Sequence, residues 1–484
     1  MPLKLEHLLL NDTDRKSIFA AEDSVTPDEK EVCDDVVLLW KQEPSSEELD
    51  ISKLYAKIKA RNQQWALPEE RFKTILANHN LYSTDSSQLF TYADQVTSLE
   101  TPDLPDKVLK KGEVRYGSRG KSLYAKVHLK QGELIFSEHD PLTPIPPLDK
   151  TALAEKGRSC SLCGLSLTQS SHFTIMNGLD CQNCSAVWCS KSCKKIDTTH
   201  PYLKHPMSKN KKIDGGGWLK FEAFCKEQVI TSAYSVGLIY ARVLVERGDG
   251  QRIWSRFKSL AQVSQKLRIK AADSSNIGGT FDASNGSPLV ESRSTWERCF
   301  DLFCGAFPTV ESEGIDLDTF LTYIGKFNIN QLSGQLYTIY SHLNHNCEPN
   351  VRYEIDSKMG LKVFARKSID AGQELLTTYV NPLHGVMLRR RELRVNWGFL
   401  CDCNRCINDL EKRKVSGPSV HLTIPSSCVN TQRRKSSLKA ARPDLSELLK
   451  NGQEFDLEIP NNIGVTSRRK SVRFDDKVMA AVEE

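Results

Sequence analysis

The chain has 484 residues, of which 39% are hydrophobic and 26% are charged. This length accommodates two to four domains, and no apolar run approaches the ~18 residues that a membrane span needs, so we expect no membrane partner. The formal net charge is +5, and residues 412–484, with 14 basic and 9 acidic side chains, carry all of this excess. A neutral body with a basic tail is not the pattern of a uniformly basic nucleic-acid-binding protein.

The N-terminal region, 1–108, is predicted to be a helical unit followed by a linker. Apolar residues at helical spacing, interrupted by Pro44 and Pro68, indicate three helices within 28–80. Residues 81–108 are polar and form the predicted linker.

Short strands are predicted next, at 113–140, where apolar segments alternate with Gly117, Gly120 and Gly132. Residues 217–247 and 250–270 are helical by their length and apolar spacing, and further helices are expected from 293 to 340. A polar loop is predicted at 271–290, and strands return at 350–366 and 374–380.

The tail, 412–484, is poor in aromatic residues and mixed in charge, so we expect it to be disordered. Its clusters of Lys and Arg either associate with chromatin and direct the chain to the nucleus, or are simply solvated charge. The N-terminus lacks the pattern of a secretory signal, so we expect the protein in the nucleus and cytoplasm. Disulfides are rare in those compartments, which makes the spacing of the 15 cysteines informative.

Eight potential metal ligands fall within 46 residues: Cys160, Cys163, Cys181, Cys184, Cys189, Cys193, His200 and His205. Zinc takes four such nitrogen and sulfur ligands in a tetrahedron, so eight ligands predict two closed, structural sites. A segment this short buries little apolar surface, and metal binding would supply its folding free energy.

A second group of motifs lies near the end of the body. Residues 341–350 read Ser-His-Leu-Asn-His-Asn-Cys-Glu-Pro-Asn, and 372–379 read Gly-Gln-Glu-Leu-Leu-Thr-Thr-Tyr. Cys401, Cys403 and Cys406 are three ligands at tight spacing, and Cys347 is the natural fourth. Such a metal would join two segments that are distant in the sequence.

These motifs resemble the SET family of S-adenosylmethionine-dependent lysine methyltransferases. The match consists of Asn-His-x-Cys-x-Pro-Asn at 344–350, Gly-x-Glu-Leu-x-x-x-Tyr ending at Tyr379, and a post-SET Cys-x-Cys-x2-Cys at 401–406. The eight-ligand segment resembles a MYND zinc finger, and the whole resembles the SET–MYND proteins. It is most similar to the fungal members, which methylate lysines in the tail of histone H-four.

The resemblance implies an α+β fold: a knotted, mostly-β SET domain of small curved sheets, split by a MYND-type finger, with helical insertions. The SET domain would occupy 113–150 and 216–400, the finger 155–210, and the post-SET segment 401–411. A helical N-terminal unit and a disordered tail would flank them.

The resemblance also pairs the metal ligands, because the pairs in a MYND finger interleave. It implies one zinc on Cys160, Cys163, Cys189 and Cys193, and a second on Cys181, Cys184, His200 and His205. A third would lie on Cys347, Cys401, Cys403 and Cys406. The ending His200-x4-His205 departs from the His-x3-Cys of the family.

Carried over position by position, the resemblance implies that S-adenosylmethionine is bound by Gly120, Lys121, Asn344, His345, Tyr379 and Phe399. Tyr379 would be the catalytic residue. Ser122 stands where the family has a second glycine, and Trp397 stands where related proteins often have a second tyrosine. Tyr337 and Tyr340 are further candidates for lining the lysine channel.

The implied reaction moves a methyl group from a sulfonium to a lysine amine. The lysine ammonium, with an ordinary pKa of ~10.4, must first lose a proton. Burial in an apolar channel and the nearby sulfonium charge both lower that pKa, and alignment of the reactants removes much of the barrier. A histone tail is the substrate that the resemblance favours. Another protein, such as a ribosomal protein, and a catalytically inactive zinc adaptor are the alternatives.

Overall fold

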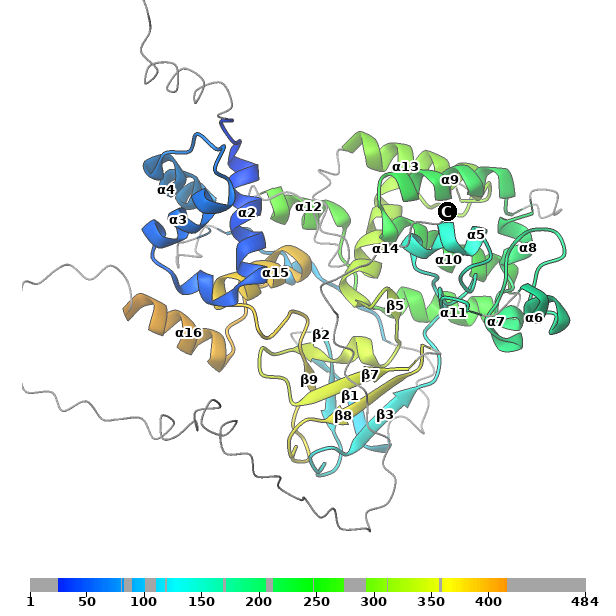
Figure 1. Ribbon diagram of the computed structural model, residues 1–484. Helices are drawn as coiled ribbons and strands as arrows, with labels where there is room; N and C mark the ends of the chain where they lie inside the picture. Colours follow the sequence, from blue (N-terminus) through cyan, green and yellow to red (C-terminus); the bar gives the residue numbers. More distant parts are fainter. Residues whose placement is uncertain are drawn as a thin grey trace, which may run out of the picture. The chain divides into compact units, whose positions relative to one another are not determined.

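The computed structural model describes residues 25–79, 81, 89–100, 110–117, 120–168, 171–205, 212–246, 248–273, 293–310, 312–356 and 359–415. These all belong to one unit, residues 1–419 (Figure 1). The predicted tail beyond 415 and most of the predicted loop 271–290 lie outside the described residues. No helix in the described ranges is both long and apolar enough to cross a membrane.

The N-terminal helices form a small unit of their own. They are α2 (Glu29–Gln42), the 3-10 helix η1 (Pro44–Glu48), α3 (Ile51–Arg61) and α4 (Glu69–Asn78), followed by η2 (Ala93–Gln95). Asp28 begins α2 with a capping box, in which Glu31 N donates to Asp28 Oδ1 at 2.6 Å and Asp28 N donates to Glu31 Oε2 at 3.0 Å. The three helices predicted within 28–80 are therefore present.

This unit packs on α15 (Val386–Trp397), whose Leu388 belongs to the same apolar cluster as Val36, Trp40 and Phe72. Glu47, 2% exposed, accepts hydrogen bonds from Met387 N at 2.7 Å and Leu388 N at 3.3 Å. A carboxylate at a helix N-terminus satisfies orphan N–H groups and complements the helix dipole. The accessory helices therefore hold the first turn of α15 in place.

The strands are short, and none of the described ones exceeds six residues. β1 (Gly112–Gly117) pairs antiparallel with β2 (Gly120–Ala125), and β3 (Leu134–Glu138), β8 (Leu361–Ala365) and β7 (Val351–Ile355) form a three-stranded antiparallel sheet in that order. β4 (Gln331–Leu332) pairs with β5 (Gln335–Leu336), and β6 (Asn344–His345) runs parallel to β9 (Leu376–Thr377). The strand predicted at 374–380 is thus only two residues long.

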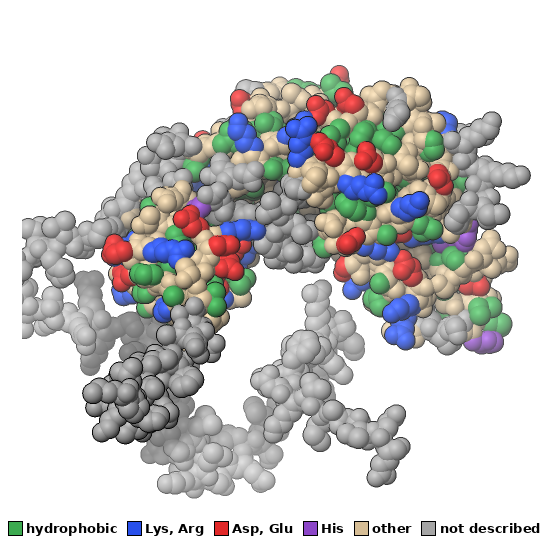
Figure 2. Space-filling view, turned by 90° about the horizontal axis from the view of Figure 1, so that it is seen from above, with side chains coloured by type: hydrophobic (Ala, Val, Ile, Leu, Met, Phe, Trp, Pro, Cys, Tyr) green, Lys and Arg blue, Asp and Glu red, His purple; other side chains and the backbone are tan. Residues whose placement is uncertain are grey.

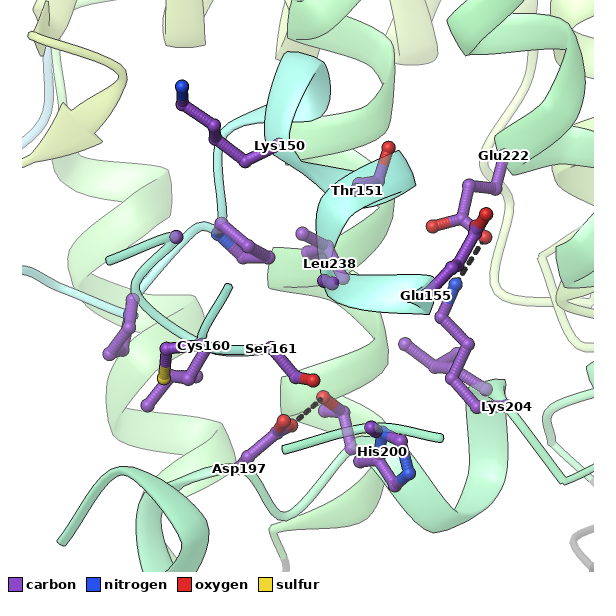
Figure 3. A pocket seen from close by; sticks show the side chains of 18 of the residues that line it. Lys150, Thr151, Glu155, Cys160, Ser161, Asp197, His200, Lys204, Glu222 and Leu238 are labelled. Carbon is purple, nitrogen blue, oxygen red and sulfur yellow. Dashed lines mark hydrogen bonds and ion pairs between the residues drawn. The ribbon is translucent and has the colours of Figure 1, made fainter. Parts of the chain in front are cut away.

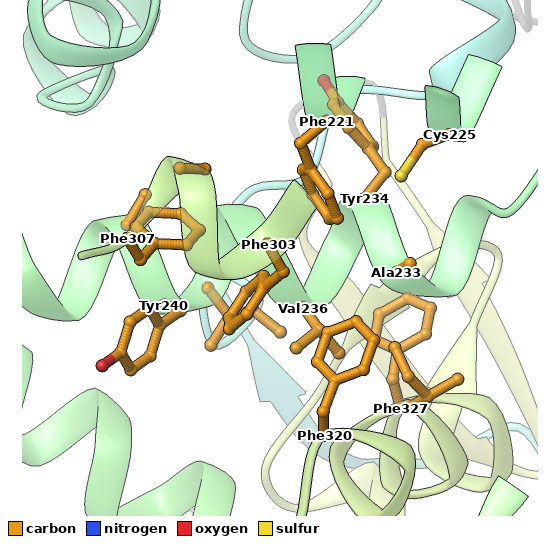
Figure 4. Packing of buried hydrophobic residues seen from close by; sticks show 14 of the residues in the cluster. Phe221, Cys225, Ala233, Tyr234, Val236, Tyr240, Phe303, Phe307, Phe320 and Phe327 are labelled. Atoms are coloured by element: carbon orange, nitrogen blue, oxygen red, sulfur yellow. The ribbon is translucent and has the colours of Figure 1, made fainter. Parts of the chain in front are cut away.

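A helical insertion separates the first strands from the last. It contains α9 (Gly215–Glu227), α10 (Thr231–Val245), α11 (Asp249–Ser259), α12 (Gln265–Asp273), α13 (Arg293–Ala306) and α14 (Leu317–Asn330). Figure 4 shows its core, in which Phe221, Tyr240, Phe303, Phe307 and Phe320 pack together. Gly217 allows α9 to approach α13, since a Cβ there would lie 2.2 Å from Gly305 O.

The three predicted helical segments of this region differ from the observed helices, and 250–270 is two helices, α11 and α12. The segment 217–247 is two helices, because the chain turns at Val229 with a φ of 53°. The helical pattern of 293–340 ends at Asn330, and a turn at Ser333 and Gly334, both with positive φ, joins β4 to β5. The short helix η5 (Tyr340–His342) follows.

In and just before the Cys/His-rich segment, the described helices are short: η4 (Leu148–Lys150), α5 (Thr151–Glu155), α6 (Ser171–Met176), α7 (Lys191–Ile196) and α8 (His200–Leu203). The last helix of the described residues, α16 (Asn404–Val415), begins at the third group of cysteines. Basic and acidic side chains are interspersed on the face seen in Figure 2, in agreement with a body of balanced charge.

Candidate active site at the crossing of β6 and β9

The two motifs that the sequence singled out meet where β6 lies beside β9. Asn344 pairs with Leu376 and His345 with Thr377. Asn350 ties this crossing together, because its Oδ1 accepts from Leu376 N at 2.7 Å and its Nδ2 donates to Glu374 O at 2.8 Å. Asn350 ends the Asn-His-x-Cys-x-Pro-Asn motif, but the sequence alone did not indicate this role.

Tyr379 follows β9 and lies over the crossing. Its hydroxyl donates to Leu343 O at 2.8 Å, and its main-chain N–H donates to His345 Nδ1 at 3.0 Å. Burial raises the pKa of the phenol, so the hydroxyl stays neutral and protonated at physiological pH. The ring lies 5.1 Å from that of Trp397 and 5.4 Å from that of His345.

His345 connects Tyr379 to a cysteine. Since Nδ1 accepts the N–H of Tyr379, the ring proton lies on Nε2, which faces Cys347 Sγ at 3.3 Å. Burial lowers the pKa of the imidazole to about 4, so the ring is neutral.

Cys347, Cys401, Cys403 and Cys406 bring their sulfur atoms within 4.8 Å of one another. Cys347 Sγ lies 3.4 Å from Cys406 Sγ and 3.9 Å from Cys401 Sγ. These separations are far longer than a disulfide bond of ~2.05 Å and fit thiolates around one zinc, for which a Zn–S bond of ~2.3 Å implies S···S distances of ~3.8 Å. The cluster could therefore hold a metal ion.

Arg389, 1% exposed, supports this cluster from α15. Its Nη2 lies 3.7 Å from Cys406 Sγ and 2.8 Å from Asp409 Oδ2. A cation beside a set of thiolates offsets part of their negative charge.

Phe399 comes to the site through the turn that ends α15. Gly398 adopts a φ of 85°, and a Cβ there would lie 2.5 Å from the ring of Tyr92, which is fully buried. Tyr92 N donates to Gly398 O at 2.9 Å, and the ring of Phe399 then lies 5.9 Å from that of His345. Tyr92 belongs to the predicted linker, and no motif marked it.

β2 brings Gly120, Lys121 and Ser122 to the crossing, although the preceding Ser118 and Arg119 lie outside the described residues. Gly120 has a φ of 83°, which favours glycine. The ammonium of Lys121 donates to Ser259 O at 2.6 Å, and burial lowers its pKa to about 8. Ser122 Oγ accepts from Asn344 Nδ2 at 2.7 Å.

The two other candidate tyrosines point their hydroxyls at protein atoms. Tyr337 OH donates to Met359 O at 2.8 Å, and Tyr340 OH lies 3.0 Å from Thr377 Oγ1. The buried carboxylate of Glu138 accepts from Ile339 N at 3.0 Å and Tyr340 N at 2.8 Å, and so fixes this segment. The sequence analysis did not single out Glu138.

The Cys/His-rich segment holds two more groups of four ligands. Cys160, Cys163, Cys189 and Cys193 form one, and Cys181, Cys184, His200 and His205 form the other, each with its ligand atoms within 4.8 Å. Cys181 Sγ lies 3.4 Å from His205 Nε2, and Cys184 Sγ lies 3.4 Å from His200 Nε2. Both imidazoles thus face thiols, including His205 at the departure from the family pattern.

A cavity of about 280 Å³ lies away from the crossing, between this segment and α9 and α10 (Figure 3). Pro146 and Leu238 are among its apolar walls, whereas Asp197, Lys204 and Glu222 contribute charge of both signs. None of the residues predicted to bind S-adenosylmethionine lines it. Its balanced charge does not indicate a particular ligand, so the crossing remains the candidate active site.

Comparisons with known proteins show which family the chain resembles. A family model described as "SET domain" matches residues 120–380. Histone-lysine N-methyltransferase SET5 of Candida glabrata is 46% identical over 519 residues, covering 100% of this chain and 99% of that protein. The protein of the same name from Eremothecium gossypii is 46% identical over 487 residues, again covering 100% and 99%.

A solved structure titled "Crystal structure of the SET domain of LSMT bound to Lysine and AdoHcy" is 10% identical, with a TM-score of 0.31, and covers 61% of this chain and 56% of that one. That likeness is too weak to inform the site. The family match and the full-length relatives confirm the resemblance of the motifs to the SET family, and the chain belongs to the SET-domain family.

Proposed function

We propose that this protein is a lysine methyltransferase that modifies a histone tail, with histone H-four as the favoured substrate. Membership of the SET-domain family assigns methyl transfer from S-adenosylmethionine to lysine. The names of the two full-length relatives support a histone substrate. The convergence of Asn344, His345 and Tyr379 at one crossing is the structural observation that carries the proposal.

The residues at the crossing suit the cofactor chemically. Asn344 and His345 offer polar groups, Gly120 exposes backbone, and Phe399 supplies an aromatic face beside His345. We assign cofactor binding to these residues together with Lys121 and Tyr379. When bound, S-adenosylmethionine supplies a methyl group on a positively charged sulfur.

Tyr379 and Trp397 would receive the substrate lysine. A lysine side chain that enters beside these rings loses its contact with water. This desolvation lowers its pKa from ~10.4 and favours the neutral amine, which has a free lone pair. The indole face attracts a cation before the proton leaves. The Tyr379 oxygen, fixed by its bond to Leu343 O, can orient a methyl group through CH···O contacts.

The three ligand groups are proposed to bind zinc, two ions in a MYND-type finger and one at the crossing. Elemental analysis of the purified protein is then expected to give three zinc ions per chain. A result of one zinc ion per chain would mean that only one ligand group binds metal, and it would contradict the proposed two-zinc finger.

Methyl transfer from labelled S-adenosylmethionine to core histones tests the proposal. Tyr379→Phe is expected to lower the rate about 100-fold, since electrostatic groups at the reacting atoms contribute on this scale. Tyr55→Phe is the matched control, because Tyr55 OH also donates to a main-chain carbonyl, that of Leu67, at 2.8 Å, but lies in the N-terminal helices. Its rate should match the native rate.

The other results separate the alternatives. Label on a ribosomal or other protein of a cell extract, but not on histones, would replace the histone substrate. No label together with no binding of S-adenosylhomocysteine would favour an inactive zinc adaptor. We also propose that the protein resides in nucleus and cytoplasm and reaches chromatin through its basic tail. Imaging of a fluorescent fusion with and without residues 416–484 tests this.

A further inference from the structure

Ser122 stands where the SET family has a second glycine, and its hydroxyl makes a hydrogen bond that a glycine cannot make. It lies in β2 with 6% of its surface exposed, and its Oγ accepts from Asn344 Nδ2 at 2.7 Å. The same nitrogen donates to Glu374 Oε1 at 2.8 Å. Both hydrogens of the Asn344 amide group are thus engaged by protein acceptors.

The contacts with Glu374 and Ser122 fix which way the amide faces. Asn344 Nδ2 donates to both side chains, so the NH2 group of Asn344, and not its oxygen, faces them. The Oδ1 atom then points away from both partners. Among the described residues, none donates a hydrogen bond to it.

An amide whose NH2 group donates to a carboxylate has a more strongly polarised carbonyl oxygen, since bonds in a chain reinforce one another. Such an oxygen favours a positively charged donor over a neutral one. Among the hydrogen-bond donors of S-adenosylmethionine, namely its amino group, ribose hydroxyls and adenine amine, only the amino group carries charge.

We propose that Ser122 is a positioning residue for the amino group of the cofactor. It acts through Asn344, whose amide it holds with Oδ1 toward the ligand. The inference rests on the proposed function, because it requires that S-adenosylmethionine binds at the crossing. With glycine or alanine in place of Ser122, one N–H of Asn344 loses its partner and the amide is held by Glu374 alone.

Calorimetry with S-adenosylhomocysteine and with its analogue bearing hydrogen in place of the amino group tests the proposal. For Ser122→Ala and Ser122→Gly, we expect binding of S-adenosylhomocysteine to weaken about 5-fold, the scale of one hydrogen bond. Binding of the deamino analogue should not change. Ser122→Thr restores a hydroxyl and should recover most of the loss.

Ser341→Ala is the matched control, since Ser341 Oγ donates to Thr338 O at 2.8 Å near the same crossing but does not contact Asn344. It should leave both affinities unchanged. An equal loss for the two ligands in Ser122→Ala, or no loss for either, would overturn the inference. Failure of the native protein to bind S-adenosylhomocysteine would instead overturn the proposed function itself. The thermal midpoint of each variant without ligand separates a binding effect from unfolding.

Discussion

The crossing of β6 and β9 combines aromatic contacts with buried hydrogen bonds to the main chain, whereas the core among α9, α10, α13 and α14 is mainly aromatic. Asn350 and Glu138 satisfy main-chain groups at the crossing, and four cysteines close it. In the insertion, the rings of Phe303 and Phe307 lie 4.9 Å apart and both contact Tyr240. The crossing should therefore respond to metal and pH, and the insertion to changes of volume.

The largest expected effect is the loss of a cysteine at the crossing. Cys406→Ala should lose one zinc ion and lower the methylation rate more than about 100-fold, because Cys347 of the same cluster contacts His345, which binds Tyr379 N. Cys184→Ala should also lose one zinc ion but keep most of the rate, since its cluster contains no residue of the crossing. Metal content and activity are measured on the same samples. Equal losses of activity would remove the distinction between the two clusters.

The next effect concerns packing in the insertion. Gly217→Ala should destabilise the protein by about 3 kcal/mol, because the new Cβ would lie 2.2 Å from Gly305 O, and overpacked contacts cost on this scale. Gly305→Ala is the matched control, since a Cβ there meets no atom within 4 Å, and it should stabilise by up to about 1 kcal/mol. Urea denaturation followed by circular dichroism gives both values. If neither substitution changed the stability, α9 and α13 would be able to move apart at that point without destabilising the protein.

The sequence predicted the three groups of metal ligands, including the distant Cys347, but missed the polar contacts between residues far apart in the chain. The ligands of the Cys/His-rich segment lie within 46 residues, so their pattern was visible in one window. The hydrogen bond that Asn344 donates to Ser122 spans 222 positions, and the one that Ile339 N donates to Glu138 spans 201. Such pairs depend on how the folded chain brings distant segments together, and the spacing of residues in the sequence does not reveal this.

The helical boundaries were missed for a different reason. Apolar periodicity continues through 217–247, but a positive φ at Val229 breaks the helix, and no proline or glycine at that position signals the turn. Tyr92 was missed because a single aromatic residue in a polar linker has no pattern. Its role depends on Gly398, whose left-handed conformation brings the chain against the ring.

The smallest expected effect is a pH dependence at the crossing. Burial raises the pKa of Glu138 from 4.5 to about 7, so the folded protein keeps a proton that the unfolded chain releases above pH ~4.5. The stability that this group contributes is therefore complete below its unfolded pKa and is lost as the pH rises through about 7. Glu138→Gln cannot titrate, and its single amide oxygen, placed where Oε1 lies, can accept from both Ile339 N and Tyr340 N.

Relative to Glu138→Gln, the native protein should thus lose about 2 kcal/mol of stability between pH 5 and pH 7.5. One pKa unit corresponds to ~1.4 kcal/mol, and this pH range covers only part of the raised pKa of Glu138. Thermal midpoints of the two proteins across this range measure it. Glu354→Gln, on an exposed part of β7, should follow the native curve. A constant difference between the native protein and Glu138→Gln would mean that Glu138 stays ionised. The main-chain N–H groups of Ile339 and Tyr340 would then stabilise its charge enough to offset the loss of water.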